Sequence, residues 1–141
     1  MSGRILRYDT VDSGSFSLRY CDYGHNGGLC AAVPDPSFII NTNDGPFSVS
    51  AHRVLDGGWH HLAGMYDGEL IKLFIDGSLI AERAARGTLQ QSTADIAIGH
   101  IDGGNATFRG EIREVTVDDV ARNHDWIRSR HQDLQSPTPD L

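Results

Sequence analysis

Residues 58–77 read Gly-Trp-His-His-Leu-Ala-Gly-Met-Tyr-Asp-Gly-Glu-Leu-Ile-Lys-Leu-Phe-Ile-Asp-Gly, and this stretch decides the fold. It contains two Asp-Gly pairs, at 67–68 and 76–77, each flanked by apolar residues. Asp and Gly tolerate the positive φ that tight hairpin turns need. Between the pairs, Ile71, Leu73 and Ile75 share one face of an extended chain, which is the period of two of a half-buried strand. The stretch therefore predicts two successive β-hairpins.

The same turn signal recurs along the chain. Asp-Gly also stands at 44–45, 56–57 and 102–103, and the first four pairs are spaced by 12, 11 and 9 residues. Such spacing is typical of short strands joined by turns. We predict strands near residues 4–8, 15–21, 29–33, 37–41, 46–52, 58–66, 69–76, 78–84, 95–99 and 107–118.

The apolar residues of the last predicted strand do not follow the alternation of a regular strand. Ile112 and Val115 are three residues apart, whereas Val115 and Val117 are two apart. One regular strand cannot hold all three on the same face, but one extra residue restores the alternation. We therefore predict a β-bulge near Arg113 or Glu114.

One helix is predicted near the C-terminus. Asn123 is a favoured N-cap residue, and Asp125 in the first turn suits the helix dipole. The helix should run to about Gln132. One side of it is formed by Trp126, Ile127, Arg130, His131 and Leu134.

The composition is that of one globular domain. The chain has 141 residues, of which 39% are hydrophobic and 22% charged. We predict a single domain over residues 1–134, and a flexible tail or linker over residues 135–141, which two prolines interrupt. The net charge of -7 repels phosphate backbones, so nucleic acid is not expected as a partner.

The sequence contains no obvious membrane or export signal. No apolar run approaches the roughly 20 residues of a membrane span. The first residues, Met-Ser-Gly-Arg, lack the apolar stretch of a signal peptide. Either a signal was removed or the chain is cytoplasmic.

Two cysteines, Cys21 and Cys30, flank a predicted hairpin tip. A turn centred near His25 and Asn26 would place the two sulfurs opposite each other. A disulfide there would contribute about 2 to 3 kcal/mol and would imply an oxidising compartment. Two reduced thiols are the alternative, and zinc is less favoured because two cysteines make half a site at best.

Four ordered motifs carry a family resemblance. Residues 58–68, then 73–77, then Ile-Ala-Ile-Gly at 96–99 and Phe-Arg-Gly-Glu-Ile-Arg-Glu-Val at 108–115 resemble successive strands of laminin G-like domains in the concanavalin A-like lectin/glucanase superfamily. With the predicted helix, the resemblance implies an all-β, antiparallel two-sheet jelly-roll sandwich with one short C-terminal helix. It also implies a lectin-like, secreted or cell-surface protein. The core is then expected around Trp59, Leu73, Ile75, Ile98, Ile112 and Val115.

The departure from the family lies at the N-terminus, where the usual first strands are absent. An incomplete sheet leaves backbone groups that can pair with another chain. We hypothesise that the edge is filled by a second copy, giving a homodimer or other homo-oligomer, by the rest of a parent protein, or by a local rearrangement.

His60 and His61 suggest a metal or catalytic site at first sight. Adjacent strand residues point to opposite faces, so the pair cannot chelate one ion without distortion. We expect one histidine satisfied in the core and one on the surface. Trp59 is expected in the core, where the family places it, rather than as a platform for a sugar.

Glu111 and Glu114 raise the question of glycoside hydrolysis, which uses two carboxylates about 5 to 10 Å apart. In a regular strand these two side chains face opposite ways, and only the predicted bulge would reunite them. No Gly-x-Ser-x-Gly motif occurs either. We therefore expect no enzyme, with a glycoside hydrolase as the weakest alternative.

Calcium is the one cofactor that the loops suggest. Hard cations prefer carboxylate, amide and carbonyl oxygens, which residues 41–44 and 100–105 offer. Asp and Asn are also ordinary turn-formers, so a structural role is the alternative. The candidate metal ligands are Asp44, Asp102 and Asn105.

The candidates for ligand binding are aromatic and amide side chains of the kind that sugar recognition favours. They are Tyr23, His25, Asn26, Asp102, Asn105 and Phe108. The leading interpretation is a non-catalytic carbohydrate- or protein-binding module, with calcium assistance left open. The alternative is a structural domain that self-associates through its incomplete sheet edge.

Overall fold

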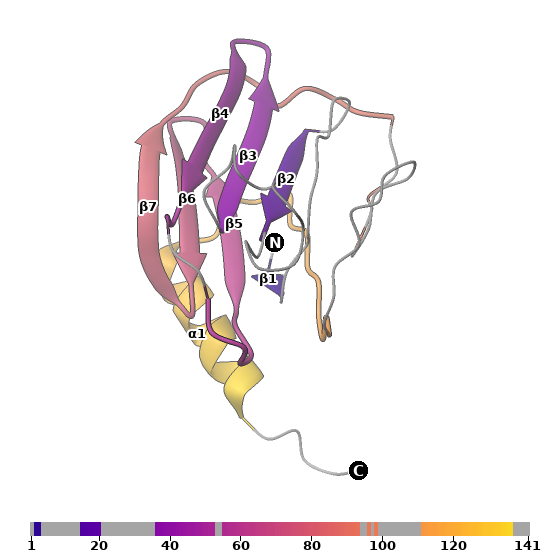
Figure 1. The fold of residues 1–141 in the computed structure, drawn as a ribbon. Helices are drawn as coiled ribbons and strands as arrows, with labels where there is room; N and C mark the ends of the chain where they lie inside the picture. Colours follow the sequence, from indigo (N-terminus) through magenta and orange to yellow (C-terminus); the bar gives the residue numbers. More distant parts are fainter. Residues whose placement is uncertain are drawn as a thin grey trace.

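The computed structural model describes residues 2–3, 15–20, 36–52, 55–93, 96, 98 and 111–136. Within them the chain forms seven strands and one helix (Figure 1). The elements are β1 (Ser2–Gly3), β2 (Phe16–Arg19), β3 (Ser37–Thr42), β4 (Gly45–Ser50), β5 (Leu62–Tyr66), β6 (Leu70–Ile75), β7 (Ser78–Ala84) and α1 (His124–Gln135).

The strands form two antiparallel sheets. One has four strands in the order β1-β5-β6-β7, and the other has three in the order β2-β3-β4. The two sheets face each other, and α1 covers the side of the four-stranded sheet that points away from β3 and β4 (Figure 1). The all-β sandwich predicted from the sequence is confirmed.

Both hairpins predicted around residues 58–77 are present. Asp76 and Gly77 have φ values of 52° and 79°, as a two-residue hairpin turn requires. At the other turn, Asp67 Oδ1 accepts the backbone N–H groups of Leu70, at 2.7 Å, and Glu69, at 2.9 Å. These hydrogen bonds favour the ionised carboxylate and lower the pKa of Asp67.

A bulge exists, but not where it was predicted. The register between β6 and β7 shifts, because Leu73 pairs with Ala81 whereas Phe74 pairs with Leu79. Residues 111–118 form no regular strand in the part of the chain that the structure describes, so the prediction of a long last strand with a bulge at Arg113 or Glu114 is wrong. This segment is fixed by side-chain contacts to α1 instead of a strand ladder: Arg113 Nη1 donates to the carbonyl of Leu134 at 3.3 Å, and Glu114 pairs with Arg130.

Other predicted strands have mixed outcomes. The strands near 15–21, 37–41, 46–52, 69–76 and 78–84 are confirmed, with ends shifted by one or two residues. The strand predicted from residue 58 begins only at Leu62. The strands near 4–8 and 29–33 lie outside the described residues, and Ile96 and Ile98 are not in a strand.

The main core lies between the two sheets. It consists of buried residues from β2 to β6 and from the chain just after β7, namely Leu18, Phe38, Ile40, Val49, Leu62, Ile71, Leu73, Ile75 and Ala85. Phe38 lies directly on Gly64, where an added Cβ would stand 2.4 Å from the ring carbons. Only glycine permits this close approach of the two sheets.

Of the six residues predicted for the core, two are buried, two are partly buried and two are exposed. Leu73 and Ile75 are 0% and 1% exposed, but Trp59 and Ile98 are 54% and 50% exposed. Trp59 lies outside because β5 begins three residues later, so the strand alternation does not reach it. Ile112 and Val115 are partly buried.

Helix α1 confirms the C-terminal helix. The side chain of Asn123 accepts the backbone N–H of Trp126 at 2.8 Å, which is the expected N-cap bond. Ile127 is buried against Ala63 and Phe74, with Met65 beside them. In the described part of the chain, no helix has the length and apolar character that crossing a membrane requires.

Candidate functional site

All six predicted ligand-binding residues lie outside the part of the chain that the structure describes. Tyr23, His25, Asn26, Asp102, Asn105 and Phe108 lie outside the described residues, as do Cys21 and Cys30. Ligand binding by the first group, metal binding by Asp102 and Asn105, and the disulfide therefore stay predictions.

Asp44 is the one candidate calcium ligand that the structure places. It stands in the β3–β4 turn, where its Oδ2 lies 3.5 Å from Arg86 Nε. Its neighbour Asn43 accepts the backbone N–H of Thr88 through Oδ1 at 2.8 Å, and Thr42 Oγ1 donates to the carbonyl of Arg86 at 2.8 Å. The side chains of this turn thus fasten it to residues 86–88. Among the described residues, no group of three or more His, Cys, Asp or Glu side chains is arranged to hold a metal ion.

The carboxylates considered for glycoside hydrolysis stand in the segment without a regular strand. Glu114 is paired with Arg130 of α1, and Glu111 is exposed. The bulge on which their pairing depended is absent from this segment.

His60 lies between two carboxylates at the start of β5. Its Nδ1 is 2.8 Å from Asp76 Oδ2, and its Nε2 is 2.8 Å from Asp56 Oδ1. Burial lowers the pKa of His60, but hydrogen bonds to the two carboxylates and their negative charges outweigh it, so the pKa is raised above its ordinary value. The imidazolium with both nitrogens protonated is the form that satisfies both contacts.

His61 has the opposite environment. It is 4% exposed, and neither ring nitrogen has a hydrogen-bond partner. Burial, reinforced by the charge of His131, lowers the pKa of His61 to about 4. The ring is therefore neutral at physiological pH. One histidine is buried and the other nearer the surface, as predicted, but the buried ring is not satisfied by hydrogen bonds.

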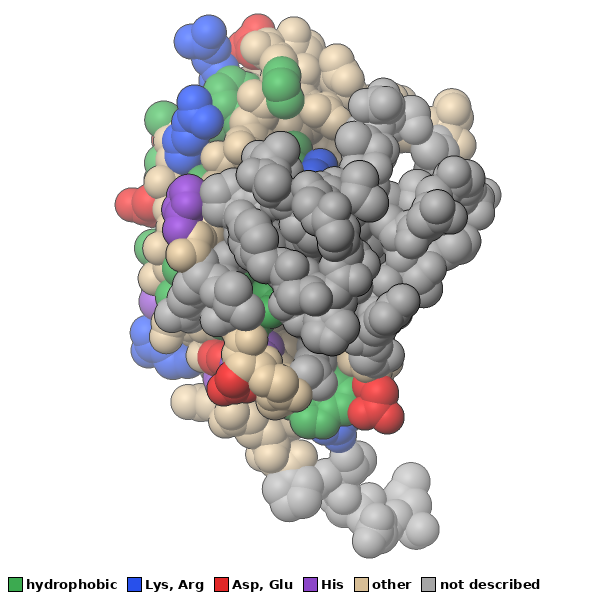
Figure 2. All heavy atoms as spheres, viewed as in Figure 1, with side chains coloured by type: hydrophobic (Ala, Val, Ile, Leu, Met, Phe, Trp, Pro, Cys, Tyr) green, Lys and Arg blue, Asp and Glu red, His purple; other side chains and the backbone are tan. Residues whose placement is uncertain are grey.

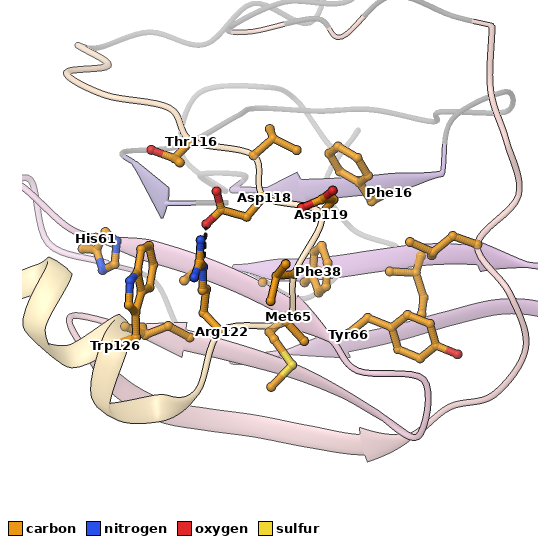
Figure 3. A pocket seen from close by; sticks show the side chains of 18 residues that line it. Phe16, Phe38, His61, Met65, Tyr66, Thr116, Asp118, Asp119, Arg122 and Trp126 are labelled. Atoms are coloured by element: carbon orange, nitrogen blue, oxygen red, sulfur yellow. Dashed lines mark hydrogen bonds and ion pairs between the residues drawn. The ribbon is translucent and has the colours of Figure 1, made fainter.

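A cavity of about 150 Å³ opens beside β5 (Figure 3). We call it the edge cavity. Its walls come from three places: both faces of β5, the β2–β3 part of the other sheet, and the chain from Thr116 into α1. The lining includes Met65, Tyr66, Val120, Arg122, Trp126 and Ile127.

Charge and an aromatic ring meet at one wall of the edge cavity. Arg122 Nε lies 3.1 Å from Asp118 Oδ2, and the Arg122 guanidinium lies over the Trp126 ring, 4.9 Å from its centroid (Figure 3). Val117, Val120 and Trp126 of this wall are 45%, 56% and 36% exposed. The wall therefore presents exposed apolar surface beside a neutralised arginine.

Of the residues that line the cavity, only His61 was considered as a site residue from the sequence, and there as a metal ligand or catalytic group. Asp118, Arg122 and Trp126 follow one another at intervals of four, a signal for one helical face, but they precede or begin α1 and meet β5 only through the tertiary fold. The described surface in the view of Figure 2 has acidic, basic and apolar side chains interspersed, so the surface in this view does not point to one site.

Comparisons with known proteins identify the family of this chain. A laminin G family model, described as the concanavalin A-like lectin/glucanases superfamily, matches residues 3–128. Pappalysin-1 of Mus musculus is 35% identical over 101 residues, which cover 67% of this chain and 6% of that protein. The chain therefore corresponds to a small part of that relative's length.

A solved structure also aligns with this chain. It is an S-layer domain-containing protein (residues 221–444) from Clostridium thermocellum, with a TM-score of 0.49 and 18% identity over 90% of this chain and 68% of that one. The family model spans both sheets and the start of α1. The chain belongs to the concanavalin A-like lectin/glucanases superfamily, as a laminin G-like domain.

Proposed function

We propose that this domain is a non-catalytic recognition module that receives an apolar side chain of a protein partner in the edge cavity. The observation that carries the proposal is the cavity itself, which joins an apolar lining to exposed Val120 and Trp126. Laminin G-like domains commonly mediate binding, which is consistent with such a role.

The size of the edge cavity favours a single side chain. Pockets for drug-sized ligands measure about 300 to 1,000 Å³. A cavity of about 150 Å³ is closer to the space that one benzene-sized group fills. Its lining residues include Met65, Tyr66 and Ile127, which suit an aliphatic or aromatic side chain better than a hydroxyl-rich sugar ring.

The charges at the mouth favour a basic flank on the partner. Asp118 is neutralised by Arg122, whereas Asp119 makes no ion pair within the described residues and is exposed. The chain as a whole has a net charge of -7. A partner segment with an apolar anchor next to Lys or Arg would therefore be attracted to this mouth.

Selection from a random peptide display library tests the proposal. We expect enriched peptides to share an apolar anchor beside a basic residue, and Val120→Asp to weaken their binding at least tenfold. Leu79→Asp is the matched control, because Leu79 is also an exposed apolar residue, 38% exposed, but does not line the cavity. Equal binding by both variants, or binding on a glycan array without any peptide, would contradict the proposal.

Self-association is a second candidate function, because the pairing of β1 with β5 involves, among the described residues, Leu62 and Ala63 of β5. Within the described residues, Gly64, Met65 and Tyr66 of β5 have a strand partner only on the β6 side. A second copy could add a strand there. Light scattering that gives a monomer mass at 100-fold different concentrations would rule this out.

We further propose that the module works outside the cell and that calcium binds at the turn containing Asp44. The location rests on the family and on the likeness to part of pappalysin-1. For calcium, a rise in melting temperature with millimolar CaCl₂ that Asp44→Asn removes is the expected result. An unchanged melt would count against it.

A further inference from the structure

Helix α1 is attached to the four-stranded sheet by a small apolar contact. Ile127 is the one buried residue of the helix, at 3% exposure, and it packs with Ala63 and Phe74. A single buried side chain leaves the attachment dependent on the polar contacts around it.

Histidines make the neighbouring contacts. The His131 ring stacks on the His61 ring, with centroids 5.8 Å apart and planes 22° apart. His124 Nε2 donates to the carbonyl of Gly77 at 2.9 Å, and its ring centroid lies 5.2 Å from that of Phe74. Imidazole rings thus join the helix to the sheet on both sides of Ile127.

The stacked pair has no place for a positive charge. Both ring nitrogens of His61 are buried without a partner. The carboxylate of Asp76 is already engaged, since Oδ1 accepts the backbone N–H of His61 at 2.9 Å and Oδ2 contacts His60 at 2.8 Å. A proton on His61 would therefore be neither solvated nor paired.

The other charged groups at this interface are engaged as well. Glu114 pairs with Arg130, whose positive charge also disfavours a charged His61. Asp125 lies 3.8 Å from Arg128 on the helix. A proton on His61 would place a positive ring against His131 and close to the positive charge of Arg130.

We propose that α1 is an acid-released cover: when His61, stacked against His131, takes up a proton, the helix leaves the outer face of the four-stranded sheet. Both ring nitrogens of His61 are buried without a partner, and separation of α1 from the sheet would expose them to water. Trp126 and Ile127 line the edge cavity, so release also dismantles that cavity. This last consequence rests on the proposed function, whereas the release itself does not.

The size of the effect follows from proton linkage. Burial holds the pKa of His61 at about 4 while the helix is in place, against about 6.5 in water. Lowering the pH from 7.5 to 5 should therefore favour release by roughly 30-fold.

Amide hydrogen exchange of the whole chain tests the inference. After correction for intrinsic exchange rates, the opening constant of residues 124–135 should rise roughly 30-fold between pH 7.5 and pH 5 and should exceed that of β6 at both pH values, because β6 opens only when the whole chain unfolds. His61→Phe keeps a flat ring against His131 but cannot titrate, so its rise should fall below about threefold. His52→Asn is the matched control, because His52 is exposed and its φ of 52° suits asparagine.

Two results would overturn the inference: opening constants of α1 and β6 that are equal at pH 5, or an undiminished rise in His61→Phe. Should His61→Phe fail to fold by circular dichroism, His61→Leu removes the same titrating ring and carries the same expectation. The exchange measurement needs no ligand. Failure of peptide selection with intact acid release therefore contradicts only the proposed function, and a helix that stays bound at pH 5 contradicts only this inference.

Discussion

The two faces of the four-stranded sheet are covered in different ways. On the inner face, Ile71, Leu73 and Ile75 are almost completely buried in an apolar core shared with the second sheet. The outer face is formed by the alternate residues of the same strands. It is covered by helix α1, which has one buried side chain, and beside it lies His61, whose ring nitrogens have no hydrogen-bond partner. The inner face provides stability, while the outer face contains titrating groups at its contact with α1.

The largest difference should appear when the inner face is truncated. Leu73 is fully buried, so Leu73→Ala should lower the free energy of unfolding by about 3 kcal/mol, through lost burial and the cavity left behind. Urea denaturation measures this. Lys72→Ala on the outer face, whose ammonium is 4.0 Å from Glu82, should cost less than about 0.5 kcal/mol. Similar losses of unfolding free energy in Leu73→Ala and Lys72→Ala would contradict the difference between the two faces.

The second-largest effect should come from acid, which destabilises the outer face through His61. The pKa of His61 is about 4 in the folded chain and about 6.5 when unfolded, so the unfolded chain binds more protons between these values and stability falls as the pH falls. The contribution lost by pH 4.5 is about 2 to 3 kcal/mol. Urea denaturation of the wild type and His61→Phe at pH 7.5 and 4.5 isolates it. An equal loss of stability in the wild type and in His61→Phe would contradict the low pKa assigned to His61.

The contact between the sheets should tolerate no added methyl group. Gly64→Ala would place a Cβ 2.4 Å from the Phe38 ring, which is itself buried, so we expect a loss of about 2 kcal/mol from overpacking. Gly57→Ala is the control, because nothing lies within 4 Å of its added Cβ. Combining Gly64→Ala with Phe38→Leu should cost less than the sum of the two single changes if the clash is real.

The N-cap of α1 should have a smaller effect. Asn123→Ala removes the 2.8 Å bond to the Trp126 N–H and should cost about 1 kcal/mol in the free energy of unfolding. Asn123→Asp keeps an acceptor and should stay near the wild type. If thermal melts rank the two variants the other way, the cap does not hold the helix as described.

His60 should show the smallest effect, with the sign opposite to His61. Its pKa is raised in the folded chain, so its contribution is present below its unfolded pKa and is lost as the pH rises through the folded value. The stability gap between wild type and His60→Gln should therefore narrow from pH 6 to pH 9. A gap that widens toward high pH would contradict the two-carboxylate environment.

Local sequence signals predicted the fold well where one short stretch decides the outcome. The turns at Asp67 and Asp76 and the cap at Asn123 depend on a few adjacent residues, and all three are confirmed. Trp59 was misplaced because its burial depends on where β5 begins. The bulge was misplaced because residues 111–118 bind a helix through side chains.

The site was harder to predict because its parts meet only in the folded chain. Met65 and Val120 are far apart in the sequence, and nothing in either local pattern indicates that they line one cavity. The unusual chemistry of His61 likewise depends on His131, which α1 brings over it. The predicted loop residues other than Asp44 lie outside the described part of the chain, so they stay predictions.

Gly77 does more than reverse the chain between β6 and β7. Many turns with positive φ accept asparagine, but a Cβ here would stand 3.3 Å from the His131 ring and 3.4 Å from the Arg128 backbone. The turn therefore sets how closely α1 approaches the sheet. Hairpin and helix should consequently vary together among related domains, and grafting either one alone onto another scaffold should leave them mismatched.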